Sequence, residues 1–176
     1  IGRLNSPDKK IRIINWNLPK EDGTYEYFGF IQSLNPKTKN YDLFSLTDKS
    51  DEIKNPENST GDNNKWFGML YYKIIPEKIN RKTYYTLLGW DGNDKISSKK
   101  IIDVLYFTQN GSPKFGEAIF IMGKKNPKRV IFEFASDATM SLKYNEKKNM
   151  IFFDYLVPND EALKGQYQYY GPSLNR

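Results

Sequence analysis

Two aspartates stand in stretches that are otherwise apolar, where a carboxyl group is the side chain best suited to acid–base chemistry. Asp103 shares one face of a predicted strand with Ile101, Leu105 and Phe107, and Asp154 shares a face with Met150, Phe152 and Leu156. Burial raises the pKa of a carboxyl group unless Lys or Arg pairs with it. Two such groups on either side of a cleft can act as acid and base in glycoside cleavage, so Asp103 and Asp154 are candidate catalytic residues.

The opposing interpretation of these carboxylates is structural. Acids within strands more often form ion pairs or lie at sheet edges than take part in catalysis. Glu117 and Glu133 are further strand carboxylates that could supply the second member of a catalytic pair. The catalytic hypothesis requires Asp103 and Asp154 to lie within about 10 Å of each other and to be open to solvent.

The chain contains neither histidine nor cysteine, which excludes much of the usual catalytic chemistry. There can be no Ser-His-Asp or Cys-His pair, no His- or Cys-ligated zinc and no disulfide. The segment Asp91-Gly92-Asn93-Asp94 has the alternating oxygens of a calcium loop, but it lacks the third alternating acid and the downstream glutamate. It is therefore interpreted as a plain Asp-Gly turn, and we expect neither a metal nor another cofactor.

Aromatic residues make up 15% of the chain, and some of them are candidates for a binding surface. Trp66 and Trp90 could stack on a sugar or a partner loop, although large aromatics of this kind are also typical of a core. Tyr167, Tyr169 and Tyr170 lie between Gly165 and Gly171-Pro172 near the end of the sequence. These three tyrosines either form an exposed contact surface or fold back as a last strand on the core.

The net charge of +6 raises the question of an anionic partner. The lysines alternate with acids along the chain, and the densest basic groups, Lys99-Lys100, Lys124-Lys125 and Lys147-Lys148, fall where turns are expected. Only five of the 27 basic residues are arginine, the residue that reads nucleic acids best. This pattern favours a solvated surface, and we expect no nucleic-acid partner.

Period-2 patterns and turn signals predict an all-β protein. Strands are expected over residues 11–18, 25–34, 41–46, 66–75, 82–90, 100–107, 115–122, 130–134, 140–144 and 150–157. The Asp22-Gly23 turn makes the first two a hairpin. The run 150–157 is apolar on both faces and is expected to be central. Residues 160–164 are expected to form the only helical turn, with Asn159 or Asp160 as its cap.

About ten strands with turns every 8 to 12 residues predict a single antiparallel β-sandwich or barrel-like meander over residues 1–176, with a β-propeller fragment as the alternative. Residues 47–65 form a polar loop, interpreted as a surface insertion rather than a binding loop. No run of apolar residues is long enough to span a bilayer as a helix. Because the sequence begins at Ile1, a preceding signal peptide or lipid anchor is an open possibility.

Several segments resemble a family of uncharacterised secreted or cell-envelope proteins of Bacteroidota-type bacteria. The resemblance lies in Trp66-Phe67-Gly68, Tyr84 to Asn93, Lys99 to Leu105, the opening Ser6 to Lys10 and the closing Tyr169-Tyr170-Gly171-Pro172. It covers most of the chain and implies an exported protein that lies in the periplasm, at the outer membrane or on the cell surface. It implies no activity, cofactor or catalytic residue.

These observations favour a non-catalytic β-rich envelope or exported domain that acts as a binding or structural component of a larger assembly. Its expected partner is a protein of that assembly or a glycan. The alternative is a carboxylate-based glycan-processing enzyme or a glycan-binding module. Such an enzyme would use Asp103 and Asp154 as its acid and base.

Overall fold

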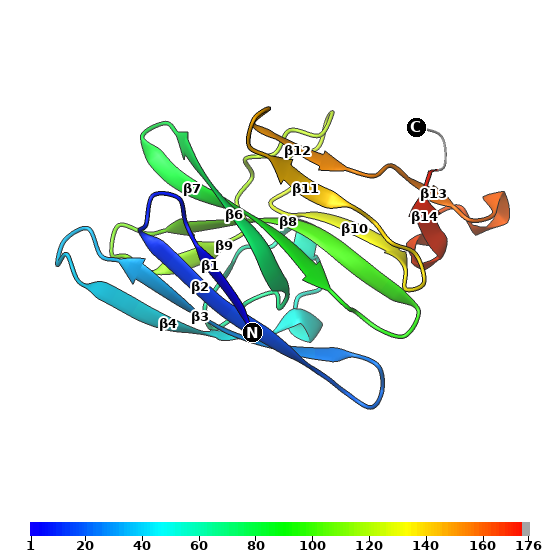
Figure 1. Ribbon diagram of the computed structural model, residues 1–176, viewed down its shortest axis with the longest axis horizontal. Coiled ribbons are helices and arrows are strands. Elements are labelled where there is room, and N and C mark those ends of the chain that lie inside the picture. The colour runs from blue at the N-terminus through cyan, green and yellow to red at the C-terminus, as the bar shows by residue number, and fades with distance from the viewer. Residues whose placement is uncertain (174–176) are drawn as a thin grey trace.

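A computed structural model describes residues 1–173, and strands dominate it (Figure 1). Four strands form an antiparallel sheet in the order β1-β2-β3-β4. Their bounds are β1 Gly2–Asn5, β2 Ile11–Pro19, β3 Tyr25–Leu34 and β4 Tyr41–Thr47. β2 and β3 form the expected hairpin, and Gly23 in its turn has φ +88°, a conformation that favours glycine.

A second, six-stranded antiparallel sheet has the order β5-β9-β8-β7-β6, with β10 also paired to β8. Its strands are β5 Gly61–Asp62, β6 Leu70–Ile79, β7 Lys82–Asp91, β8 Ser97–Phe107, β9 Pro113–Phe115 and β10 Val130–Ala135. β8 is long enough for two partners along one edge. Residues 97–102 pair with β10, and residues 105–107 pair with β9.

The main core lies between these two sheets, because apolar side chains from both enter one buried cluster. From the four-stranded sheet come Ile11, Ile13, Tyr27, Ile31 and Leu46, and from the larger sheet come Ile74, Tyr85, Leu87, Ile101, Leu105 and Phe115. The alternation of side chains along β2 explains which of its residues enter this cluster, since every second side chain from Ile11 to Asn15 points inward. The all-β, antiparallel prediction is confirmed.

The other face of the larger sheet is covered by a small hairpin. Its strands are β11 Leu142–Asn145 and β12 Met150–Phe153. Leu142 joins Ile75, Leu88, Ile102 and Val130 in a second buried cluster, against which Phe120, Phe132, Tyr144 and Ile151 pack. A last pair of strands, β13 Leu156–Pro158 and β14 Tyr170–Pro172, follows the hairpin.

The prediction of a central strand over 150–157 is wrong. The run is broken between β12 and β13, and within residues 1–173 β12 pairs only with β11. Phe152, Phe153 and Tyr155 have 43%, 48% and 75% of their surface exposed. An apolar run shows that burial would be favourable, but not that a neighbouring element is present to provide it.

Other strand boundaries also differ from the expectation. β6 continues through Pro76 to Ile79, and the turn to β7 consists of Asn80 and Arg81 alone, both at positive φ. Pro76 is tolerated there because β6 is an edge strand. The return strand expected over 115–122 is only the three residues of β9, and β8 begins at Ser97.

Helical structure in the described residues is limited to four short 3₁₀ turns: η1 Ser50–Glu52, η2 Pro56–Asn58, η3 Glu161–Leu163 and η4 Tyr167–Tyr169. η3 is the expected turn, and the Asp160 carboxylate accepts a hydrogen bond from Ala162 N at its start. No helix within residues 1–173 is long and apolar enough to cross a membrane.

The polar segment 47–65 contains η1, η2 and β5, and hydrogen bonds attach it to the sheets. Thr47 N donates to Asn63 O at 2.8 Å, and Trp66 N donates to Thr47 O at 3.0 Å. Arg129 Nη1 donates to Pro56 O at 2.7 Å. Through these bonds η1 lies beside the ends of β3 and β7, where the candidate site is found.

Candidate ligand-binding cleft

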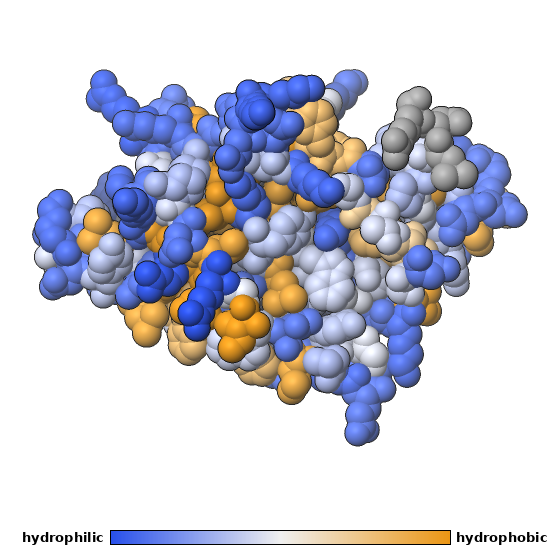
Figure 2. Space-filling model, viewed as in Figure 1, coloured by the Kyte–Doolittle hydropathy of each residue, from blue (hydrophilic) through white to orange (hydrophobic). Residues whose placement is uncertain are grey.

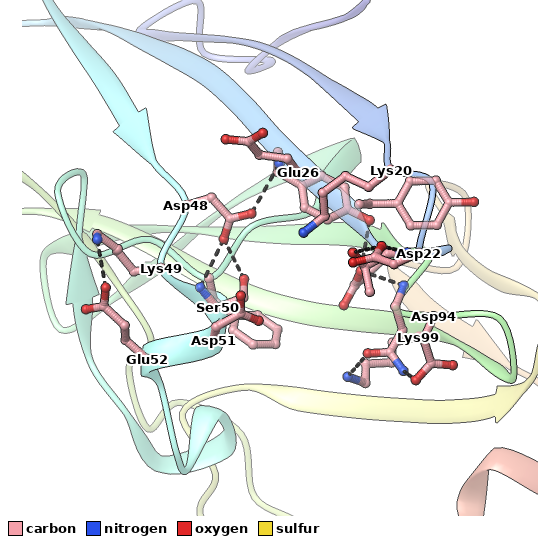
Figure 3. A pocket seen from close by; sticks show the side chains of 16 residues that line it. Lys20, Asp22, Glu26, Asp48, Lys49, Ser50, Asp51, Glu52, Asp94 and Lys99 are labelled. Carbon is pink, nitrogen blue, oxygen red and sulfur yellow. Dashed lines mark hydrogen bonds and ion pairs between the residues drawn. The ribbon is translucent and has the colours of Figure 1, made fainter.

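A cleft of about 570 Å³ opens where the β2–β3 turn, the η1 segment and the β7–β8 turn meet (Figure 3). Its wall consists of Lys20, Asp22, Thr24, Tyr25, Glu26, Tyr27, Asp48, Lys49, Ser50, Asp51, Glu52, Phe67, Asp91, Asn93, Asp94 and Lys99. The three contributing segments are far apart in the sequence. The fold therefore creates a site that no single motif encodes.

The lining of the cleft is acidic, although the whole chain has a charge of +6. Seven of the lining residues are Asp or Glu and three are Lys. Two of these lysines have partners within the cleft: Lys49 Nζ lies 2.7 Å from Glu52 Oε1, and Lys99 Nζ donates to Asn93 Oδ1 at 2.6 Å. The sign of the local charge is thus opposite to that of the rest of the molecule.

The inner wall of the cleft is built around the Tyr27 side chain. Tyr27 OH donates to Asp91 Oδ1 at 2.8 Å and accepts a hydrogen bond from Gly92 N at 2.8 Å. Asn93 N donates to the same Asp91 oxygen at 2.8 Å. Burial raises the pKa of Asp91, and the neighbouring charge of Asp48 raises it further. Burial and then the Asp91 carboxylate also raise the pKa of Tyr27.

Asp48 is the second organised carboxylate of the cleft. Its Oδ2 accepts a hydrogen bond from Tyr27 N at 3.2 Å, and its Oδ1 accepts bonds from Ser50 N at 3.0 Å and Ser50 Oγ at 2.6 Å. Ser50 Oγ in turn accepts from Gly68 N at 2.8 Å. A Cβ at position 68 would lie 2.4 Å from the Asp48 carboxylate, so this approach requires glycine.

The aromatic wall depends on a second close approach. A Cβ at position 92 would lie 2.2 Å from the Tyr25 ring. Glycine at that position allows the ring to pack edge-on against Trp90, at a centroid distance of 5.6 Å. Tyr25 lines the cleft, and Trp90 is half-buried behind it. Trp90, one of the predicted binding residues, therefore supports the wall from behind.

The carboxylate oxygens of the Asp91–Asp94 turn accept hydrogen bonds from backbone N–H groups in and next to the turn. Asp94 Oδ1 accepts hydrogen bonds from Ile96 N and Ser97 N at 2.8 and 2.9 Å, and Asp91 Oδ1 accepts those described above. In the part of the chain that the structure describes, no three acidic, histidine or cysteine side chains are grouped so as to hold a metal ion.

The predicted catalytic candidate Asp103 lies in the main core. Its side chain has no exposed surface and forms an ion pair with Arg129, with 3.0 Å between Arg129 Nε and Asp103 Oδ1. Tyr71 OH donates to Asp103 Oδ2 at 3.2 Å, and Trp66 Nε1 donates to Tyr71 OH at 2.9 Å. Asp103 is therefore ion-paired, as the structural interpretation of the strand carboxylates expects. A substrate cannot reach it in this conformation.

Asp154 lies elsewhere, after the β11–β12 hairpin on the opposite face of the larger sheet. Its Oδ2 accepts a hydrogen bond from Ser141 N at 2.8 Å, which holds the hairpin's start. The structure does not bring Asp154 and Asp103 to one cleft. Glu133 accepts a bond from Ser97 Oγ at 2.7 Å, and Glu117 lies near the Tyr106 hydroxyl. Neither glutamate lines the acidic cleft.

Trp66 lies in the core with no exposed surface, rather than on the expected stacking surface. Tyr167 and Tyr169 are 58% and 37% exposed, and Tyr170 is half-buried. The Tyr167 and Tyr170 rings are 5.1 Å apart, and Tyr170 OH accepts a hydrogen bond from Gly165 N at 2.9 Å. This segment folds back to pair β14 with β13, while Tyr167 remains open to solvent.

No sequence pattern predicts that Asp48 and Asp91 both bond to Tyr27. In the sequence, Asp91 belongs to an Asp-Gly turn and Asp48 to a polar loop. Tyr27 and Asp91 are 64 positions apart, so no local pattern connects them. Comparison of the chain with protein-family models, with curated proteins and with solved structures finds no match.

Proposed function

We propose that this protein is a non-catalytic binding domain whose acidic cleft receives a cationic group, such as the amine or guanidinium of a partner protein. The observation that carries this proposal is the local reversal of charge: seven acids line a cleft in a chain of net charge +6. A concave site focuses such a potential and attracts ligands of the opposite sign.

The geometry of the wall supports binding. Asp48 and Asp91 are held by backbone N–H groups and by the Tyr27 backbone and hydroxyl, so little freedom is lost when a ligand enters. Tyr25 and Phe67 add aromatic surface to the same lining, and an aromatic face also attracts cations. A volume of about 570 Å³ suits one side chain or a short peptide segment.

The proposal is tested by titrating the protein with tri-lysine and tri-arginine peptides, and with a tri-serine peptide as the neutral control. Binding is followed by amide chemical shifts at Ser50, Gly68 and Gly92, whose N–H groups donate hydrogen bonds to side chains of the wall. We expect the cationic peptides alone to shift these signals, and the affinity to fall as salt increases.

Variants of the rim make this test specific. Asp51→Asn with Glu26→Gln removes two exposed charges of the lining and should weaken tri-lysine binding about three- to tenfold. Glu77→Gln with Asp137→Asn removes the same charge from exposed positions outside the lining and should leave the affinity unchanged. Equal weakening by both pairs would mean that only the net charge of the protein matters, and the proposal would fail.

A second candidate function has one specific observation in its favour. Asp91 has a raised pKa and shares its cleft with another carboxylate, Asp48, as in sites that use one acid and one base. A glycan-processing reaction would use this pair rather than Asp103 and Asp154. Release of reducing ends from soluble glycans, abolished by Asp91→Asn and by Asp48→Asn, would establish this activity in place of simple binding.

The two larger sheets, which share one buried cluster, are best classified as a β-sandwich. We further propose that the protein is exported and works as part of an assembly at the cell envelope, as its resemblance to envelope proteins implies. Immunodetection of the full-length protein in periplasmic, membrane and cytosolic fractions tests this location.

A further inference from the structure

Two turns project at the upper edge of the molecule as it is drawn in Figure 1. Exposed apolar side chains lie in the first turn and directly after the second. The first lies between β9 and β10 and contains Ile121 and Met122, which are 84% and 47% exposed. The second joins β11 to β12 and is followed by Met150 and Phe152, which are 54% and 43% exposed. Figure 2 shows apolar and strongly hydrophilic side chains next to each other at this edge, over β12.

The same two turns each contain a pair of adjacent lysines. Lys124-Lys125 lies in the first turn and Lys147-Lys148 in the second, and all four residues are exposed. The one acid of residues 121–125 and 145–150 is Glu146, whose Oε1 is 2.7 Å from Lys73 Nζ. The projecting edge, defined as these two turns with Met150 and Phe152, is therefore strongly positive.

Hydrogen bonds and apolar packing anchor the base of the projecting edge. Met122 N donates to Lys125 O at 2.9 Å, and Lys125 N donates to Met122 O at 3.0 Å, which closes the first turn tightly. Phe120 before it and Ile151 in β12 pack against the same buried cluster. The four exposed apolar side chains thus lie on segments whose neighbouring residues are anchored in the core.

We propose that the projecting edge docks onto an anionic lipid bilayer surface. The exposed apolar side chains would enter the boundary between headgroups and acyl chains, while the lysine ammonium groups contact lipid phosphates. Charge complementarity identifies the surface as anionic. The four exposed apolar side chains favour a bilayer over a nucleic acid, because a nucleic acid would leave them in water. The two turns also contain no arginine, the residue best suited to read bases.

Co-sedimentation with vesicles tests this proposal. Vesicles of pure phosphatidylcholine are compared with vesicles that contain about 30% phosphatidylglycerol, a composition at which each nearby lysine adds appreciable affinity. We expect binding to the anionic vesicles alone, with release at high salt. Lys147→Gln with Lys148→Gln should weaken binding about 30-fold. Ile121→Ser with Met150→Ser should also weaken it, because apolar insertion contributes to the affinity.

The matched control is Lys37→Gln with Lys39→Gln, which removes the same charge from exposed positions in the β3–β4 turn. It should bind anionic vesicles like the unchanged protein. Thermal melts of all variants show whether each is folded, which keeps a loss of binding distinct from unfolding. An equal loss in the control, no binding to anionic vesicles, or retention of a DNA duplex at salt concentrations that release the vesicles would each overturn the proposal.

Discussion

Arg129 and Asp103 form an ion pair that is closed to solvent, with side chains only 2% and 0% exposed. Two approaches join them, 3.0 Å from Nε to Oδ1 and 3.2 Å from Nη2 to Oδ2. Arg129 Nη1 also donates to Pro56 O, so the pair connects the main core to the polar segment 47–65. The carboxylate that the sequence suggested as catalytic is the centre of this internal network.

Removal of one partner of this pair should be strongly destabilising. Asp103→Ala leaves the Arg129 charge buried without its counter-ion and should lower the free energy of unfolding by about 3–5 kcal/mol. Urea denaturation measures this loss. Glu161→Gln, which breaks the exposed pair with Lys164, is the control and should change stability by less than about 0.5 kcal/mol. Similar small losses in both variants would show that the Arg129–Asp103 pair is not buried in solution.

The Tyr27 hydroxyl should contribute measurably to stability. Tyr27→Phe leaves Gly92 N without its acceptor and removes the donor to Asp91, at a cost of about 1–3 kcal/mol. The measurement is again the unfolding free energy. Tyr41→Phe, at a position 55% exposed, provides the comparison and should be nearly neutral. A neutral Tyr27→Phe would mean that water replaces the hydroxyl at both partners.

The raised pKa of Asp91 predicts a specific pH dependence. The usual carboxyl value is 3.8, and the folded-state pKa of Asp91 is higher. Above pH 3.8 the folded state therefore holds the proton more tightly than the unfolded state, so the contribution of Asp91 to stability falls as pH rises through the folded pKa.

Asp91→Asn keeps the acceptor oxygen but cannot ionise. Its unfolding free energy, relative to that of the unchanged protein, should increase as the pH is raised from acid to neutral. Paired urea denaturations across this pH range give the difference directly. A difference that stays constant across this pH range would contradict the raised pKa of Asp91.

The β6–β7 turn carries local strain that one substitution should relieve. Asn80 and Arg81 have φ of +48° and +68°, and a bulky residue in this region is disfavoured. Arg81→Gly should stabilise the protein by about 0.5–1 kcal/mol, since Asn-Gly suits a two-residue hairpin turn. Differential scanning calorimetry should show a higher Tm. Lys78→Gly, within β6, should lower it, and a drop in both variants would rule out relief of strain.

The C-terminal tyrosines can be divided by role. Tyr170→Ala removes the acceptor for Gly165 N and the ring next to Tyr167, so it should lower Tm by several degrees. Tyr167→Ala removes a ring that is 58% exposed and should leave Tm nearly unchanged while weakening any contact with a partner. Measuring Tm and binding for both variants separates the two roles. If Tyr167→Ala lowered Tm as much as Tyr170→Ala, the whole cluster would be structural.

Local features of the sequence determined most of the secondary structure. The Asp22-Gly23 turn and the alternation of Ile11, Ile13 and Asn15 predict the first hairpin, because turn conformation and side-chain direction depend on neighbouring residues alone. The Asp160 cap of η3 is equally local. The absence of histidine and cysteine restricted the chemistry in the same direct way.

Tertiary structure decided what lies next to these elements. The run 150–157 is apolar, yet its β12 part is an exposed hairpin strand, because a sequence states which residues favour burial and not which element covers them. The partner of Asp103 is 26 positions away, and Tyr27 is 64 positions from Asp91. Ion pairing and burial at such separations follow from how the sheets pack. The acidic cleft therefore could not be predicted from the sequence, since it exists only where three distant turns meet.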